Sequence, residues 1–108
     1  MVELDPVAGC ESNKRRPAVL VSNDRANTVA ERLGRGVVTI VPLTGNVERV
    51  YPFQVFLPAD ATGLSRPSKA QAEQVRSVSV QRLGPRIGHL SASLVADMDA
   101  ALRLHLAL

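Results

Sequence analysis

The sequence is poor in the residues that build disulfides and metal centres. Its 108 residues include one cysteine, Cys10, and two histidines, His89 and His105. A single cysteine excludes an internal disulfide and fits a reducing compartment. The histidines and the cysteine do not have the spacing of metal ligands. We therefore expect a protein without a metal ion or another cofactor.

Long apolar runs are also missing, and so is the basic start of a secretory leader. No apolar stretch approaches the ~20 residues that a transmembrane helix needs. The opening residues, MVELDPVAGCE, contain acidic side chains and no basic one. A signal peptide begins with positive charge. These features predict a cytoplasmic protein with no membrane-spanning part.

Aromatic residues are scarce, at 3% with no Trp, although hydrophobic residues make up 45% of the chain. The core must therefore be built from Val, Leu, Ile and Ala. The length predicts one domain over residues 1–108. A core this poor in aromatics gains stability by burying surface between subunits, which gives modest support to a dimer.

The formal net charge is +3. A basic balance favours an anionic partner such as nucleic acid. The alternative is ordinary solubility, and charge alone does not decide between the two.

One stretch organises the chain: the cations Lys14, Arg15 and Arg16 run into the apolar segment AVLV, with Pro17 between them. Proline has no N–H and belongs at the first position of a strand. It also biases Arg16 toward an extended backbone. A guanidinium held at the mouth of a buried strand is suited to binding a phosphate oxyanion. The alternative is an arginine in a surface ion pair.

Short apolar or alternating segments separated by turn residues predict strands at 2–4, 17–22, 36–43, 51–57, 68–80 and 86–90. Helices are expected at 24–33 and from residue 91 onward, and 58–67 is expected to be a loop. This order predicts a mainly β (α+β) fold, an antiparallel sheet or small barrel with a C-terminal helix.

Two details of this pattern bear on the site and the core. Pro42 lacks a ladder donor, so the strand is expected to end or bulge there and to leave Thr44 just past a rigid strand. The terminal helix is expected to be capped by Ser91. Its core stripe is expected at i, i+4 spacing, formed by Leu94, Met98, Leu102 and Leu106.

Five segments in order resemble the MazF/PemK family of toxin endoribonucleases: RRPAVLVSNDRAN, TIVPLTGN, YPFQVFLP, QAEQVRSV and LVADMDAALRLHLAL. The resemblance covers nearly the whole chain. It implies an SH3-like barrel that works as a homodimer and a toxin of a toxin–antitoxin pair. It further implies metal-independent, sequence-specific cleavage of single-stranded RNA (mRNA, with tRNA or rRNA as alternatives) to 2′,3′-cyclic phosphate and 5′-hydroxyl ends. A cognate antitoxin protein is the expected inhibitor.

The resemblance also assigns catalytic residues. Arg16 is expected to stabilise charge on the phosphoryl oxygens, because a guanidinium rarely transfers protons. The family pattern points to Thr44 for hydrogen bonding and proton relay, with a simple turn residue as the alternative. Glu11 falls on the acidic residue of the loop 7–15, which in the family lies over the substrate groove. A solvated loop acid is the alternative for Glu11.

The residues expected to hold RNA come from two places. The loop contributes Asn13, Lys14 and Arg15. The segment EQVR contributes Gln74, whose amide suits a base edge, and Arg76, which suits a phosphate. His89 and His105 match no family position and are expected to be structural or on the surface.

Two other functions remain open at this point. A gyrase inhibitor of the CcdB type shares the implied fold, but such toxins typically end in Trp and lack the Arg-Pro and Pro-Leu-Thr pairing. An inactive RNA-binding relic is suggested by the first strand, which is shorter than in most of the family.

Overall fold

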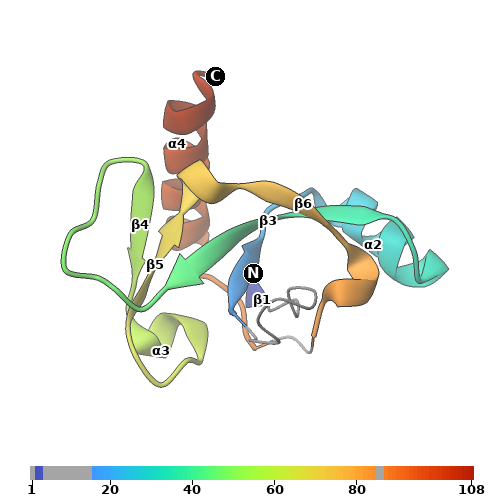
Figure 1. Cartoon of the computed structure of the whole chain (residues 1–108), viewed down its shortest axis with the longest axis horizontal. Coiled ribbons are helices and arrows are strands. Elements are labelled where there is room, and N and C mark those ends of the chain that lie inside the picture. Colours follow the sequence, from blue (N-terminus) through green and yellow to red (C-terminus); the bar gives the residue numbers. More distant parts are fainter. Residues whose placement is uncertain (1, 4–15, 85–86) are drawn as a thin grey trace.

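The computed structural model describes residues 2–3, 16–84 and 87–108 (Figure 1). The strands are β1 (Val2–Glu3), β2 (Ala18–Leu20), β3 (Val37–Thr44), β4 (Gln54–Leu57), β5 (Ser68–Gln71) and β6 (Arg76–Ser79). The helices are α2 (Asp24–Leu33), α3 (Ala59–Thr62) and α4 (Ala92–Leu106), with the 3-10 turns η1 (Ala72–Gln74) and η2 (Val80–Arg82).

The sheet is built around β3. Its pairing order is β1-β2-β3-β5-β4, β6 also pairs with β3, and every pair is antiparallel. The predicted mainly β (α+β) fold with a C-terminal helix is confirmed. Among the described strands no pairing joins β1 to β4, so the sheet is open there and does not close into a barrel.

The strand expected at 68–80 is wrong as a single element. It is divided by η1 into β5 and β6, which pair with opposite ends of the same edge of β3. Thr44 pairs with Lys69 of β5, and Ile40 pairs with Arg76 of β6. The stretch of β3 between these pairings faces the 3-10 turn.

Pro42 explains why that interruption is tolerated. Leu43 N–H donates to the Pro17 carbonyl (3.0 Å), and Val21 N–H donates to the Thr39 carbonyl (2.9 Å). These bonds direct the odd-numbered backbone groups of β3 toward β2, so the nitrogen of Pro42 points to the other edge. The expectation that the strand ends or bulges at Pro42 is therefore wrong, because it is the partner strand that breaks there.

Other differences from the expected elements are local. Strand β4 begins at Gln54 because a turn precedes it, closed by Gln54 N–H donating to the Tyr51 carbonyl (2.8 Å). The expected loop 58–67 contains the short helix α3, which ends at Gly63 with a left-handed φ of 82°. The strand expected at 86–90 is reduced, within the described residues, to a single bridge at Gly88.

The two faces of the sheet bury different cores. On one face, Val19, Val41 and Leu43 pack with Met98 and Ala101 of α4. On the other, Val38 and Ile40 pack in a second cluster with Ala18, Ala30 and Val78. Figure 1 shows α4 beside β4, with further contacts to η1, and α2 at the other end of β3. The second face therefore has no cover from α4 over its central part.

Helix α4 begins as expected, with the Ser91 hydroxyl accepting from Leu94 N–H (3.3 Å). Met98 is buried, and Leu94 and Leu102 are partly buried against the same core. Leu106 is 50% exposed, so the core stripe of this helix ends one turn earlier than expected. No described helix has the length and apolarity needed to span a membrane.

Candidate active site

Arg16 and Thr44, predicted from separate strands, line the same cavity of about 380 Å3. Side chains alternate between the faces of a strand, so Ile40, Pro42 and Thr44 share the face that α4 leaves open. Arg16 and Ala18 share that face on the neighbouring segment. The cavity therefore lies where the start of β2 meets the end of β3.

The turn η1 supplies the opposite wall. Gln74 and Arg76, both expected to bind RNA, line the cavity, and so does Gln71. In a continuous strand Gln71 would face away from Gln74, because they are an odd number of residues apart. The 3-10 turn removes that alternation and brings Gln71, Gln74 and Arg76 to one cavity. Sequence reasoning missed Gln71 because it assumed an unbroken strand.

A second cavity of about 430 Å3 adjoins the first and shares Arg16, Pro17 and Thr44 with it. Its remaining lining comes from the end of β3 and from the segment between α3 and β5: Leu43, Gly45, Leu64, Ser65, Arg66, Pro67 and Ser68. Arg66 was not predicted as a site residue. Its segment contains a single arginine, so the sequence there shows no charge pattern that would indicate a binding site.

The electrostatics of both cavities favour an anion. Arg16, Arg66 and Arg76 are exposed, and within the described part of the chain their guanidinium groups make no hydrogen bond or ion pair. None of the described lining residues of either cavity is acidic. Guanidiniums without carboxylate partners are suited to binding phosphate in a bidentate manner.

Thr44 is held with its hydroxyl in a defined position. Its Oγ1 accepts a hydrogen bond from Asn46 N–H (3.3 Å), and the Asn46 side chain accepts from Glu48 N–H (3.3 Å). The hydroxyl acts as an acceptor in this turn and so keeps its own proton for donation. A half-buried threonine with a free proton is able to hydrogen-bond a phosphate oxygen.

The connection after Thr44 is fastened to the sheet by buried polar groups. Lys69 Nζ donates to the Arg49 carbonyl, and Gln54 Nε2 donates to Glu73 Oε2 (2.7 Å). Gln54 Oε1 also accepts from Tyr51 N–H (3.1 Å). Lys69 and Gln54 are each only 8% exposed. These bonds tie the segment after Thr44 to β5 and to η1, which carries Gln74.

Four of the predicted residues, Glu11, Asn13, Lys14 and Arg15, lie outside the described residues and stay predictions. His105 is exposed on α4, as expected. In the described part of the chain, no group of three or more His, Cys, Asp or Glu side chains is placed to hold a metal ion.

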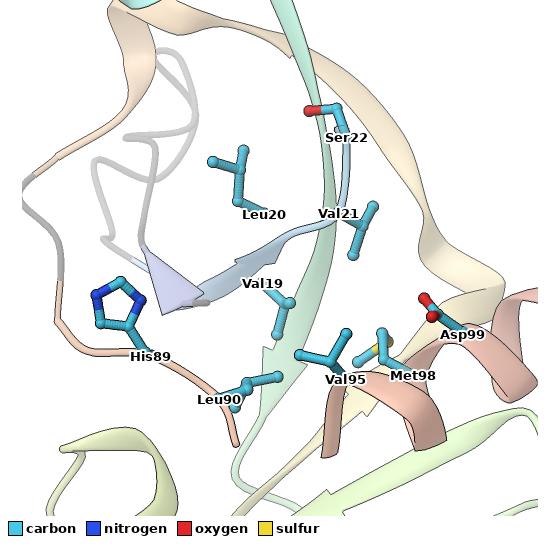
Figure 2. A pocket seen from close by; sticks show the side chains of 9 residues that line it. All are labelled: Val19, Leu20, Val21, Ser22, His89, Leu90, Val95, Met98 and Asp99. Atoms are coloured by element: carbon cyan, nitrogen blue, oxygen red, sulfur yellow. The ribbon is translucent and has the colours of Figure 1, made fainter. Parts of the chain in front are cut away.

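His89 belongs to a different cavity, of about 320 Å3, between β2 and α4 (Figure 2). Val19, Leu90 and Met98 converge on it, with His89 and Asp99 at opposite sides. Neither Arg16 nor Thr44 lines this cavity. It is a gap beside the main core, and its two titratable groups are separated from the arginine-lined face.

Residues 1–106 match the model of the family described as PemK-like, MazF-like toxin of type II toxin-antitoxin system. The chain belongs to this family. It is 59% identical over 97% of its length to Endoribonuclease MazF9 of Mycobacterium tuberculosis, of which it covers 89%.

Solved structures agree with this membership. The Mycobacterium tuberculosis toxin MazF-mt6 has the same fold, with a TM-score of 0.79 at 24% identity, and the match covers 99% of this chain and 96% of that one. A MazE–MazF structure from Deinococcus radiodurans matches with a TM-score of 0.73 at 26% identity, over 98% of this chain and 92% of that one.

The predicted family is thus confirmed, and with it the predicted class of toxin. The MazF9 relative is an endoribonuclease by name, in agreement with the predicted activity. The comparisons do not favour the gyrase-inhibitor alternative.

Proposed function

We propose that this PemK/MazF-family toxin cuts single-stranded RNA in the cavity that Arg16 and Thr44 share, without a metal ion. These two side chains come from different strands and converge on one cavity. That cavity has unpaired arginines and no acidic residue among its described lining residues. The family and the endoribonuclease relative support RNA as the substrate.

In the proposed reaction the ribose 2′-oxygen attacks the adjacent phosphorus, and the bond from phosphorus to the 5′-oxygen breaks. The 2′-hydroxyl proton leaves and the 5′-oxygen gains a proton, which gives a 2′,3′-cyclic phosphate and a 5′-hydroxyl. Arg16 stabilises the negative charge that grows on the non-bridging oxygens. Thr44 donates a hydrogen bond to the same phosphate and relays a proton. Glu11 is the third catalytic candidate that the sequence resemblance gives, and it lies outside the described residues.

The RNA chain around the reacting phosphate is held by the wall that η1 supplies. Gln71 and Gln74 offer paired donors and acceptors to base edges, which single-stranded RNA exposes. Arg76 binds a phosphate next to the one that is cut. Asn13, Lys14 and Arg15, which lie outside the described residues, are proposed to bind the RNA as well.

The first test uses the purified protein, a mixed-sequence RNA and an excess of chelator. We expect cleavage to persist, because the proposed chemistry needs only charge stabilisation and proton transfer by side chains. Mapping of product ends should give 2′,3′-cyclic phosphates and 5′-hydroxyls. Loss of cleavage in chelator, with recovery on adding a divalent ion, would overturn the metal-free mechanism.

We further propose that residues 1–108 act as one cytoplasmic toxin domain that is inhibited by a cognate antitoxin protein. The family description names a toxin-antitoxin system, and the Deinococcus radiodurans structure is of MazE–MazF. The uncompensated arginines offer a surface on which an acidic or amphipathic antitoxin segment would compete with RNA.

A homodimer is proposed as the working unit. The support within this chain is apolar surface on α2 and the start of β3, where Val29, Leu33 and Val37 are 51%, 58% and 64% exposed and line one shallow depression. Burying such side chains between subunits is favourable. Sedimentation at micromolar concentration should give a dimer; a monomer at all concentrations would contradict this proposal.

A further inference from the structure

The two cavities on the open face of the sheet meet at the proposed catalytic side chains. Arg16, Pro17 and Thr44 are the only described residues that line both. The first extends from them toward η1 and β6, and the second toward the segment between α3 and β5. A phosphate bound at Arg16 and Thr44 would therefore have a hollow on each side.

RNA cleavage needs a nucleotide on each side of the phosphate. The nucleotide on the 5′ side supplies the attacking 2′-oxygen, and the nucleotide on the 3′ side supplies the leaving 5′-oxygen. We propose that the two cavities hold these opposite sides, with the cavity of Arg66 as a second RNA subsite. This inference rests on the proposed function and adds the path of the RNA across the sheet.

The second cavity has the chemistry of a nucleotide subsite. Arg66 presents a guanidinium with no partner among the described residues, which suits the next phosphate along the chain. Leu43, Leu64 and Pro67 provide apolar surface for a base or ribose. Ser68 is 4% exposed, and its buried hydroxyl makes no hydrogen bond within the described part of the chain.

The turn that leads into the segment of Arg66 is held by internal contacts. The Thr62 side chain is 1% exposed, and its hydroxyl accepts from Leu64 N–H (3.0 Å) while donating to the Ala59 carbonyl (3.2 Å). Gly63 turns the chain at positive φ, where an added Cβ would lie 3.2 Å from Ile87. A turn held in this way reduces the ordering cost of binding.

The test pairs arginine variants with trimmed RNAs. The sequence around the cleavage position found in mixed-sequence RNA is built into a synthetic RNA. This RNA is then shortened on the 5′ side or on the 3′ side of the cleaved phosphate. kcat and KM are measured for wild type, Arg66→Ala, Arg76→Ala and the matched control Arg103→Ala on the exposed end of α4. Arg66→Glu serves as a stronger variant at the same exposed position.

On the full RNA, Arg66→Ala should raise KM about ten-fold with kcat within about two-fold, as for the loss of a hydrogen bond to a charged group. Shortening one side should abolish the effect of Arg66→Ala only, and shortening the other should abolish the effect of Arg76→Ala only. With an uncleavable RNA carrying a 2′-deoxy nucleotide at the attack position, Arg66→Ala should reduce the salt dependence of binding by about 0.7 in logarithmic slope.

The inference fails if Arg66→Ala and Arg66→Glu both behave like Arg103→Ala, or if Arg66 and Arg76 respond to the same shortened side. Either result leaves the proposed function intact when wild type still cleaves and Arg16→Ala does not. Absence of RNA cleavage by wild type, or full cleavage by Arg16→Ala, would overturn the proposed function itself and this inference with it.

Discussion

Replacing Arg16 by alanine is expected to slow RNA cleavage by about 10²–10³-fold in a protein that keeps its fold. The guanidinium lines both cavities on the open face of the sheet and has no partner among the described residues. Its removal therefore takes away positive charge at the site without breaking another contact in the described part of the chain. The side chain is exposed at the mouth of β2. Single-turnover rates, with circular dichroism to check the fold, measure the effect.

The shape of the side chain at position 16 is expected to matter as well as its charge. Arg16→Lys should lose much of the activity, because an ammonium cannot offer the planar pair of donors that matches a phosphate. Arg103→Ala, on the exposed end of α4, should cleave at close to the wild-type rate. A folded Arg16→Ala protein that cleaves as fast as Arg103→Ala would show that the assigned site is wrong.

Replacing Thr44 by alanine is expected to lower kcat by about 10- to 100-fold, the range for losing a hydrogen bond to a charged group. RNA affinity should change much less, because the hydroxyl bond strengthens as the phosphate gains charge. Thr44→Ser should retain part of the activity. Quench experiments at saturating RNA give kcat, and binding of a 2′-deoxy RNA gives affinity.

A control variant separates loss of the Thr44 hydroxyl at the phosphate from loosening of the turn that holds it. Thr44 Oγ1 also accepts from Asn46 N–H, so Thr44→Ala loosens the turn as well as removing a donor. Asn46→Ala removes the neighbouring bond to Glu48 N–H and loosens the same turn without touching the hydroxyl. If Asn46→Ala lowers kcat as much as Thr44→Ala does, Thr44 acts by shaping the turn and not on the phosphate.

The family resemblance pointed to Arg16 and Thr44 as catalytic candidates, and local chemistry accounts for where the two side chains lie. Pro17 places Arg16 at the mouth of β2, and the buried run of β3 carries Thr44 to the other side of the same cavity. The C-terminal helix was equally accessible, since Ser91 caps it and Met98 marks its buried side. These features depend on neighbours in sequence or on simple periodicity.

The rest of the site depends on contacts between strands that no single segment shows. Gln71 reaches the cavity only because η1 breaks the alternation, and that break lies opposite Pro42 of another strand. Arg66 reaches the site because α3 forms inside an expected loop and ends at Gly63. A pattern read along one strand cannot predict where its partner will be interrupted.

A double-mutant cycle on Arg16 and Thr44 tests most directly whether the two side chains act on one phosphate. Single-turnover cleavage rates are measured in chelator for wild type, Arg16→Ala, Thr44→Ala and the double variant, with all four checked for fold. Residues that work as a unit give strongly non-additive losses. If both side chains act on one phosphate, the double variant should be little slower than Arg16→Ala alone. Losses that simply multiply, or no loss in either single variant, would show that they do not act together there.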